Sequence, residues 1–236
     1  MHRFFAPEIE HTLTLPEEES QHAVRVLRLT EGDEIEVVDG KGTLYLCRIS
    51  LAHNKKCGVE IVERRPNMPH WGNKIVMCVA PTKNLDRIEW FAEKCTEMGM
   101  DRLIPLRCRY SERKELKIER LQKILVSAMK QSLKATLPEL DEMTPIKEVL
   151  EMPFVGQKFI CYCDDAIDRK LFVSEYRPGV DTMILIGPEG DFSKEEVELA
   201  LKNGFVPVSL GDSRLRTETA AVAACFVCHT VNQLQR

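Results

Sequence analysis

The sequence predicts an α/β protein in which a small N-terminal β-barrel precedes a larger domain with a mostly parallel sheet. Three observations lead to this prediction. Short apolar runs separated by turn residues occupy residues 1–68, which is typical of an all-β unit. Apolar runs that alternate with amphipathic segments occupy residues 73–236, as in parallel sheets with crossover helices. Between them, residues 64–73 are rich in proline, glycine and asparagine, which indicates a linker.

The barrel prediction depends on a hairpin. Residues 34–38 and 44–49 alternate apolar and polar side chains, and the Asp39-Gly40 pair between them favours a tight turn. Two further elements are expected, a strand over residues 59–62 and one short helix near residues 18–29.

The larger domain contains apolar runs that predict buried strands, at residues 75–80, 103–106, 159–163, 182–186 and 205–210. Helical stripes lie between most of these runs. In the first helix we expect Asp86 and Glu89 to cap the N-terminus and Gly99 to end the helix. The last helix, from about residue 219 to residue 234, is apolar for most of its first half. This predicts burial in the core or at a subunit interface.

The composition is that of a globular protein without a membrane segment. The 236 residues carry a formal net charge of -4, which normally argues against nucleic acid as a partner. No apolar run approaches the ~18–20 residues of a transmembrane helix, and the N-terminus lacks the pattern of a secretory leader. The nine cysteines have no framework spacing, so we expect free thiols in the cytoplasm. Cys225, Cys228 and His229 resemble half a zinc site, but no second pair has suitable spacing, and no metal is expected.

Charge is unevenly distributed along the chain. Residues 102–134 contain ten lysines and arginines but only three glutamates, an excess of seven positive charges. Ion pairs between residues four apart on a helix explain only part of this stretch. We therefore expect a phosphate-contacting surface there, with a weaker second patch in the barrel.

Two polar segments each follow a predicted strand and precede a predicted helix. The first is GPEG at residues 187–190, and the S-x-x-E pattern of a helix capping box begins at Ser193. On local pattern alone an ordinary strand-to-helix turn explains it equally well, and the Walker phosphate loop is absent. The second, residues 208–220, gathers two arginines, a glutamate and two threonines where helix N–H groups are unpaired. Two such turns favour a shared ligand pocket.

These segments resemble the SPOUT class of methyltransferases, and more closely the bacterial 16S ribosomal RNA uridine-N3 methyltransferases of the RsmE type. The resemblance rests on GPEG after an apolar strand and on L-G-x-x-x-L-R-T-E-T-A at residues 210–220. Three further stretches match that family. They are H-x-x-x-V-L-R-x-x-x-G-D at residues 22–33, K-x-x-x-R-x-E-W-x-x-x-K-x-T-E at residues 83–97, and Q-S…P-E at residues 131–139. Together the motifs span nearly the whole chain.

The resemblance implies a PUA-like, RNA-binding barrel over residues 1–68 and a SPOUT methyltransferase domain over residues 73–236 with a C-terminal trefoil knot. Knots are so rare that sequence pattern alone would exclude one. The resemblance further implies a cytoplasmic homodimer that binds S-adenosyl-L-methionine and methylates N3 of a specific uridine in 16S ribosomal RNA, in a small-subunit particle. Two alternatives stay open: a SPOUT enzyme that acts on another RNA site or atom, such as a ribose 2′-hydroxyl, and a non-catalytic RNA-binding protein.

Carried over to this chain, the resemblance assigns site residues. The cofactor-binding residues would be Cys163, Asp164, Ile186, Gly187, Pro188, Glu189, Gly190, Ser209, Leu210, Gly211, Leu215, Arg216, Thr217, Glu218 and Thr219. The matched motifs and the basic patches together suggest RNA-binding residues, namely Arg3, His22, Arg25, Arg28, Lys83, Arg87, Arg109, Arg113, Lys130, Gln131 and Lys134. Three positions depart from the family pattern: Asp191 replaces a glycine, Lys130 a glutamate and Tyr110 an arginine.

The expected chemistry sets the catalytic candidates. Uridine N3 carries a proton and becomes nucleophilic when that proton leaves, so a carboxylate or a cation that stabilises the anion would assist. We expect Arg216 to stabilise the anion, and Glu218 or Glu189 to accept the proton or anchor the cofactor. For each of the three, a salt bridge or helix-start contact is an equally good interpretation. Because N3 lies on the pairing edge, the target base must be unpaired or flipped.

Overall fold

The computed structural model describes residues 1–163 and 168–234. The chain folds into two compact units, which are described separately. The first comprises residues 1–70 and 126–137, and the second comprises residues 71–125 and 138–236. The expected boundary within residues 64–73 lies where the first unit ends, but residues 126–137 return to that unit.

The first unit is built on a four-stranded sheet in the order β1 (Arg3–Phe5), β2 (Glu34–Val38), β3 (Thr43–Leu51) and β4 (Gly58–Pro66). The pairs β2–β3 and β3–β4 are antiparallel, whereas β1 pairs with β2 in parallel. The expected hairpin turn is present, because the Asp39 carboxylate accepts hydrogen bonds from the backbone N–H groups of Lys41 and Thr43, at 2.7 and 3.0 Å.

The single helix expected near residues 18–29 is instead a chain of short turns. These are α1 (Ile9–Thr12), α2 (Glu17–Gln21) and a π-helical turn η1 (His22–Val26). Residues 126–137 contribute Met129 and Ala135, which are buried together with Val38. Met129 lies in the last turns of α4 (Ile118–Gln131), so one helix belongs partly to each unit.

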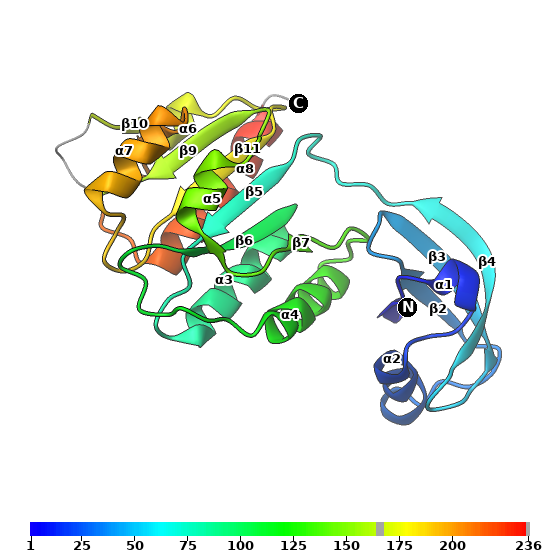
Figure 1. Ribbon diagram of the computed structural model, residues 1–236. Helices are drawn as coiled ribbons and strands as arrows, with labels where there is room; N and C mark the ends of the chain where they lie inside the picture. The colour runs from blue at the N-terminus through cyan, green and yellow to red at the C-terminus, as the bar shows by residue number, and fades with distance from the viewer. Residues whose placement is uncertain (164–167, 235–236) are drawn as a thin grey trace. The chain divides into compact units, whose positions relative to one another are not determined.

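The second unit contains an eight-stranded sheet, drawn in Figure 1. Its order is β10 (Lys170–Leu171), β12 (Val206–Ser209), β9 (Gln157–Cys161), β11 (Thr182–Ile186), β5 (Ile75–Val79), β6 (Arg102–Arg107) and β7 (Glu139–Leu140), and β8 (Thr144–Pro145) also pairs with β6. Every strand pairing that the described residues form in this sheet is parallel. The prediction of a mostly parallel α/β domain is therefore confirmed.

Helices cover both faces of this sheet (Figure 1). On one face, α5 (Ile146–Glu151) and α7 (Lys194–Lys202) pack on alternate strand residues, in a core that includes Val76, Ile104 and Leu185. On the other face, α8 (Thr217–Leu234) packs against β5, β11 and α3 (Leu85–Met98). The short helix α6 (Phe172–Glu175) also contacts α8. This alternation of faces follows from the two-residue period of a strand.

The ends of two helices test the expected caps. The capping box of α7 is present, because Ser193 accepts from the N–H of Glu196 and Glu196 accepts from the N–H of Ser193. Gly99 ends α3 with a φ of 126°. The expectation that Asp86 and Glu89 cap the start of α3 was wrong. Asn84 is the N-cap, and its side chain accepts from the N–H of Asp86, because its amide oxygen, two residues earlier, reaches a free N–H group of the helix.

The last helix has a buried stripe at helical spacing, which includes Ala221, Ala224, Cys225 and Cys228. Phe226 lies outside this stripe and is 60% exposed. Within residues 1–163 and 168–234, no helix has the length and apolar character needed to span a bilayer.

The topology of the sheet brings three strand ends together. Cys161 at the end of β9 lies in register with Ile186 at the end of β11 and with Val208 near the end of β12. Strand β6 lies on one side of β5, whereas β11 and β9 lie on the other, so the strand order reverses beside the end of β11. Ligands of open α/β sheets bind outside the carboxyl ends of strands at such a reversal.

Candidate functional site

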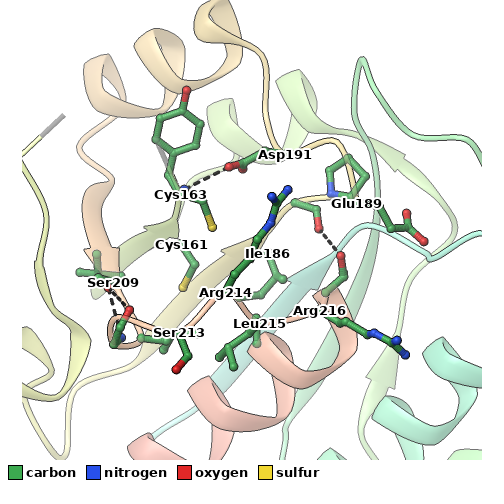
Figure 2. Close-up of a pocket in the computed structure, with 18 of the residues that line it drawn as sticks. Cys161, Cys163, Ile186, Glu189, Asp191, Ser209, Ser213, Arg214, Leu215 and Arg216 are labelled. Carbon is green, nitrogen blue, oxygen red and sulfur yellow. Dashed lines mark hydrogen bonds between the residues drawn. The ribbon is translucent and has the colours of Figure 1, made fainter. Parts of the chain in front are cut away.

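A cavity of about 350 Å³ lies at the carboxyl ends of β9, β11 and β12, and Figure 2 shows its lining. This volume is within the range of roughly 300–1,000 Å³ that small-molecule sites occupy. Among the predicted cofactor residues, the cavity is lined by Cys163, Ile186, Gly187, Pro188, Glu189, Ser209, Leu210, Gly211, Leu215, Arg216 and Thr217. The two polar turns singled out in the sequence therefore form walls of one cavity.

Four of the predicted cofactor-binding residues are not in this lining. Gly190 lines a neighbouring cavity. Glu218 and Thr219 belong to the first turn of α8 and are outside the described lining, Glu218 buried and Thr219 exposed. Asp164 lies outside the described residues.

The turn after β11 is held by its neighbours. The hydroxyl of Thr217 donates to the carbonyl of Gly187 at 3.1 Å, which joins this turn to the start of α8. The carboxylate of Glu189 accepts from the backbone N–H of Lys83 at 2.9 Å, and in Figure 2 it points away from Cys161 and Cys163. Glu189 thus ties the turn to the loop before α3.

Glu218 makes a second link across the site. Its Oε1 lies 3.7 Å from Nε of Arg87, an α3 residue that lines the cavity. Its other oxygen, Oε2, is buried and has no hydrogen-bond partner among the described residues. A buried carboxylate attracts a nearby cation. Glu218 therefore stabilises the guanidinium of Arg87 at the wall of the cavity.

Asp191 connects the turn after β11 to the residues that follow β9, which form another wall of the cavity. Its Oδ2 accepts from the backbone N–H of Cys163 at 3.0 Å, and its Oδ1 accepts from the N–H of Phe192 at 2.8 Å. Its φ of 62° lies in the left-handed region, where glycine is usual and aspartate is tolerated. The Asp191 side chain therefore bonds the turn to the residues that follow β9.

The lining is both apolar and cationic. The apolar part includes Ile186, Pro188, Val208, Leu210, Leu215 and Ala220. Four arginines line the cavity, namely Arg87, Arg169, Arg214 and Arg216, against the two carboxylates Glu189 and Asp191. In Figure 2 the side chain of Arg214 extends toward Asp191, whereas that of Arg216 extends away from Cys161 and Cys163. The net positive lining favours an anionic ligand or an anion that forms during a reaction.

Cys161 lines the cavity, but its thiol is not activated as a nucleophile. Burial raises the pKa of the Cys161 thiol to about 12, so this side chain is neutral at physiological pH. A neutral thiol is a poor nucleophile and a poor metal ligand. Residues 1–163 and 168–234 contain no group of three or more histidine, cysteine or acidic residues placed to hold a metal ion.

Two of the lining arginines were missed in the sequence. Arg214 falls on one of the variable positions of the L-G-x-x-x-L-R motif, so the motif itself passes over it. Arg169 lies beyond the end of β9, outside every recognised pattern, and no sequence signal identifies it.

The predicted RNA-binding residues of the first unit differ in how far their side chains are exposed to solvent. His22, Arg25, Arg28 and Gln131 are exposed, and Lys134 is half-buried. Lys130 pairs with Glu19 at 2.5 Å, which joins the end of α4 to α2 and brings residues 22–28 and 130–134 into one unit. Arg3 is less available, because its side chain is 8% exposed and bonds Glu36 through Nε and Nη2.

The predicted RNA-binding residues of the second unit are largely engaged in hydrogen bonds or ion pairs. Lys83 contacts Glu112 at 2.9 Å, and Arg113 donates to the carbonyl of Lys83 at 2.8 Å. Arg109 forms an exposed ion pair with Glu195 at 3.3 Å. Such exposed pairs are weak, about 0–1 kcal/mol, so phosphate groups can compete for these cations. Arg87 faces the cavity.

Comparison with known proteins decides the family. Residues 69–229 match the model of an RNA methyltransferase domain, and residues 15–62 match that of an RNA methyltransferase PUA domain. A ribosomal RNA small subunit methyltransferase E from Synechocystis is 30% identical over 93% of this chain and 74% of its own length. The chain belongs to this family of RNA methyltransferases.

Two solved structures extend the likeness over the full chain. A probable rRNA-methyltransferase from Porphyromonas gingivalis is 43% identical, with a TM-score of 0.94 and complete coverage of both chains. A ribosomal RNA small subunit methyltransferase E from Neisseria gonorrhoeae, bound to S-adenosyl methionine, is 28% identical, with a TM-score of 0.86 and coverage of 98% of each chain. The predicted family, the α/β fold and the N-terminal PUA domain of this methyltransferase are thereby confirmed.

Proposed function

We propose that this protein transfers a methyl group from S-adenosylmethionine to N3 of a specific uridine in 16S ribosomal RNA. The observation that carries the proposal is that the GPEG turn and the loop before α8 line one cavity together. This cavity lies at the ends of three adjacent parallel strands. The names of the relatives, small subunit methyltransferases, agree with this substrate.

The cavity suits S-adenosylmethionine in size and chemistry. The apolar side chains of Ile186, Leu210 and Leu215 suit the adenine ring and the thioether part of the molecule. Gly211 has a φ of 122°, and no described atom lies within 4 Å of the place that a Cβ would take. The loop therefore presents bare backbone groups to the cavity, which can pair with the polar edge of a cofactor.

The bound cofactor supplies an electrophilic methyl group whose bond to sulfur breaks with both electrons staying on sulfur. The uridine N3 anion supplies the electron pair of the new N–C bond, and the N3 proton passes to a carboxylate or to water. The chain's contribution is electrostatic. The four cavity arginines stabilise the negative charge that spreads over the base as N3 loses its proton. We assign this role to Arg216 and Arg214, of which Arg214 is the one whose side chain extends toward Asp191.

We assign the two glutamates supporting roles. Glu189 anchors the GPEG turn through Lys83, which keeps one wall of the cofactor site in place. Glu218 lies behind Arg87 and holds its guanidinium at the wall of the cavity. A removal of Glu218 should therefore affect both RNA methylation and the position of Arg87.

The RNA surface in this proposal has two parts. In the first unit, the exposed Arg25, Arg28 and His22 lie with Gln131 and Lys134 in one compact body. Cations on such a surface bind the phosphate backbone without reading sequence. The base itself must leave its stack to reach the cavity in the second unit.

We further propose that the protein is a cytoplasmic homodimer that acts on a small-subunit particle, with the trefoil knot of the SPOUT class. Phe226 on α8 is 60% exposed and supports self-association through this helix, because aromatic side chains are enriched in protein interfaces. Sedimentation of the wild type should give a dimer, and Phe226→Glu should give a monomer. A wild-type monomer at micromolar concentration contradicts this part of the proposal.

The decisive test of the function is reverse transcription across 16S RNA from cells with and without the gene. A methyl group on N3 blocks base pairing, so the wild-type RNA should give a stop that disappears in the deletion strain. A stop that persists refutes the target. Calorimetry tests the non-catalytic alternative, because a purely RNA-binding protein would show no affinity for S-adenosylmethionine. Nuclease digestion with mass spectrometry distinguishes base methylation from 2′-O-methylation.

A further inference from the structure

A second cavity, of about 690 Å³, adjoins the proposed cofactor cavity. The two share part of their lining, including Cys163, Asp191 and Arg214. The second cavity has its own wall, which includes Tyr110, Lys194 and Asp212. A molecule in one cavity therefore lies directly beside a molecule in the other, as the two partners of a transfer reaction must.

Tyr110 is an aromatic side chain held in place at this wall. It follows β6 and packs against the GPEG turn, since a Cβ added to Gly190 would lie 3.2 Å from Cβ of Tyr110. The guanidinium of Arg109 lies 5.9 Å from the centre of the ring. The backbone N–H of Arg109 donates to Glu196 at 2.7 Å, which anchors the segment to α7. The side chain nevertheless remains 50% exposed.

A fixed, half-exposed aromatic ring is the usual platform for an unstacked nucleobase. Proteins that bind single-stranded nucleic acid stack bases on such rings, at roughly 1–3 kcal/mol per base. Tyr110 is 50% exposed and lines the second cavity, so part of the side chain is available to a ligand there.

The charges of the second cavity suit a nucleotide. Arg169, Arg214 and Lys194 line it, against the carboxylates of Asp191 and Asp212. Arg214 lines both cavities and extends toward Asp191 in Figure 2. A guanidinium at this shared wall can donate to a uracil carbonyl oxygen, and both uracil carbonyls flank N3. The lysine and the other arginine are suited to the phosphates on either side of the base.

We propose that the second cavity receives the flipped target uridine, with the base stacked on Tyr110 and a base carbonyl bonded to Arg214. This inference rests on the proposed function, because it names the binding place of that reaction's second substrate. It assigns a role to Tyr110, which lines the second cavity and not the first.

The test compares Tyr110→Ala with Tyr110→Phe, which keeps the ring. The methyl-transfer rate at limiting small-subunit RNA should fall about 5- to 150-fold in Tyr110→Ala, the equivalent of one base stack, and less than twofold in Tyr110→Phe. The Kd of S-adenosylmethionine, measured by calorimetry, should change less than twofold in both. Thermal unfolding confirms that both variants are folded.

A second measurement does not depend on turnover. Uridine 5′-monophosphate, titrated with S-adenosylhomocysteine present, should shift the ring resonances of Tyr110 in NMR spectra of the wild type and bind more weakly to Tyr110→Ala. The inference is overturned if Tyr110→Ala loses affinity for S-adenosylmethionine, which would make the cavity part of the cofactor site, or if it retains wild-type turnover and nucleotide binding. If the wild type binds the nucleotide through Tyr110 but does not methylate small-subunit RNA, the proposed function fails and the site stands.

Discussion

The bond between Asp191 and Cys163 gives the sharpest test of how the cofactor cavity is built. Two physical effects meet at Asp191. Its carboxylate joins two walls of the cavity through the N–H of Cys163, at 3.0 Å. Its backbone has a φ of 62°, which costs an L-amino acid roughly 1–2 kcal/mol. Substitution by alanine removes this bond and the second one, to the N–H of Phe192, and keeps the backbone cost. Substitution by glycine removes both bonds and the backbone cost as well.

The magnitudes follow from the exposure of the bond. A hydrogen bond to a charged group contributes about 1.5–3 kcal/mol, but Cys163 is exposed and water replaces part of the loss, so we take about 1 kcal/mol. Asp191→Ala should therefore lower the free energy of unfolding by about 1 kcal/mol. In Asp191→Gly, relief of the backbone cost offsets the lost bond, and the stability should stay near that of the wild type.

The affinity for the cofactor should behave differently from the stability. Both variants lose the link that fixes the residues after β9, so both should bind S-adenosylmethionine about fivefold more weakly, the equivalent of about 1 kcal/mol. Calorimetry gives the Kd and urea titration gives the stability. If Asp191→Gly binds the cofactor as tightly as the wild type, the bond does not organise the cavity. If the alanine and glycine variants are equally stable, the backbone argument is wrong.

Three further predictions concern other parts of the second unit. Arg216→Ala should lower the kcat of methylation about 100- to 1,000-fold at unchanged thermal stability, as loss of one anion-stabilising group does, and an active variant would remove Arg216 from the mechanism. Thr217→Val keeps the side-chain shape but removes the donor to Gly187, so the free energy of unfolding should fall by about 1–3 kcal/mol, and an unchanged urea midpoint would contradict this. Gly99→Ala should lower stability by about 2–4 kcal/mol, since φ is 126° and a Cβ would lie 2.5 Å from the Trp71 ring. Its control, Gly179→Ala, has a φ of 74° with no described atom near its Cβ and should lose only about 1 kcal/mol in thermal melts.

Local pattern was sufficient for much of the fold. The run over residues 182–186 is β11 with the same limits, and the S-x-x-E pattern is the capping box of α7. These features depend on residues within one turn or one strand, and their physics is visible in sequence. Asn84 shows the limit of this approach, because asparagine, aspartate and glutamate near a helix start are all plausible caps until the backbone decides which one reaches a free N–H.

The candidate site was predicted as a set of segments, but not as a set of contacts. Glu189 bonds the backbone of Lys83, which is 106 residues away in the chain. Glu218 faces Arg87, and Arg214 lines both cavities. Each of these relations depends on which strands are neighbours, and no periodicity or spacing encodes that order. Residues 126–137 join the first unit through contacts that are distant in the chain, and no change of composition in the sequence marks this segment.

The charge distribution is best understood at the scale of the cavity. A formal net charge of -4 describes the whole chain, yet the proposed reaction takes place between four arginines and two carboxylates. Both carboxylates there are engaged with backbone N–H groups, Glu189 with that of Lys83 and Asp191 with those of Cys163 and Phe192. Their negative charge is thus directed into structural bonds. Two of the arginines are also held, Arg87 by Glu218 and Arg169 by the carbonyl of Tyr162, while Arg214 extends toward Asp191 in Figure 2. A uridine that loses its N3 proton here gains stabilisation that bulk water does not provide, because preoriented cations need no reorganisation. In the proposed function, the acidic remainder of the chain repels RNA and so favours binding at the basic surfaces.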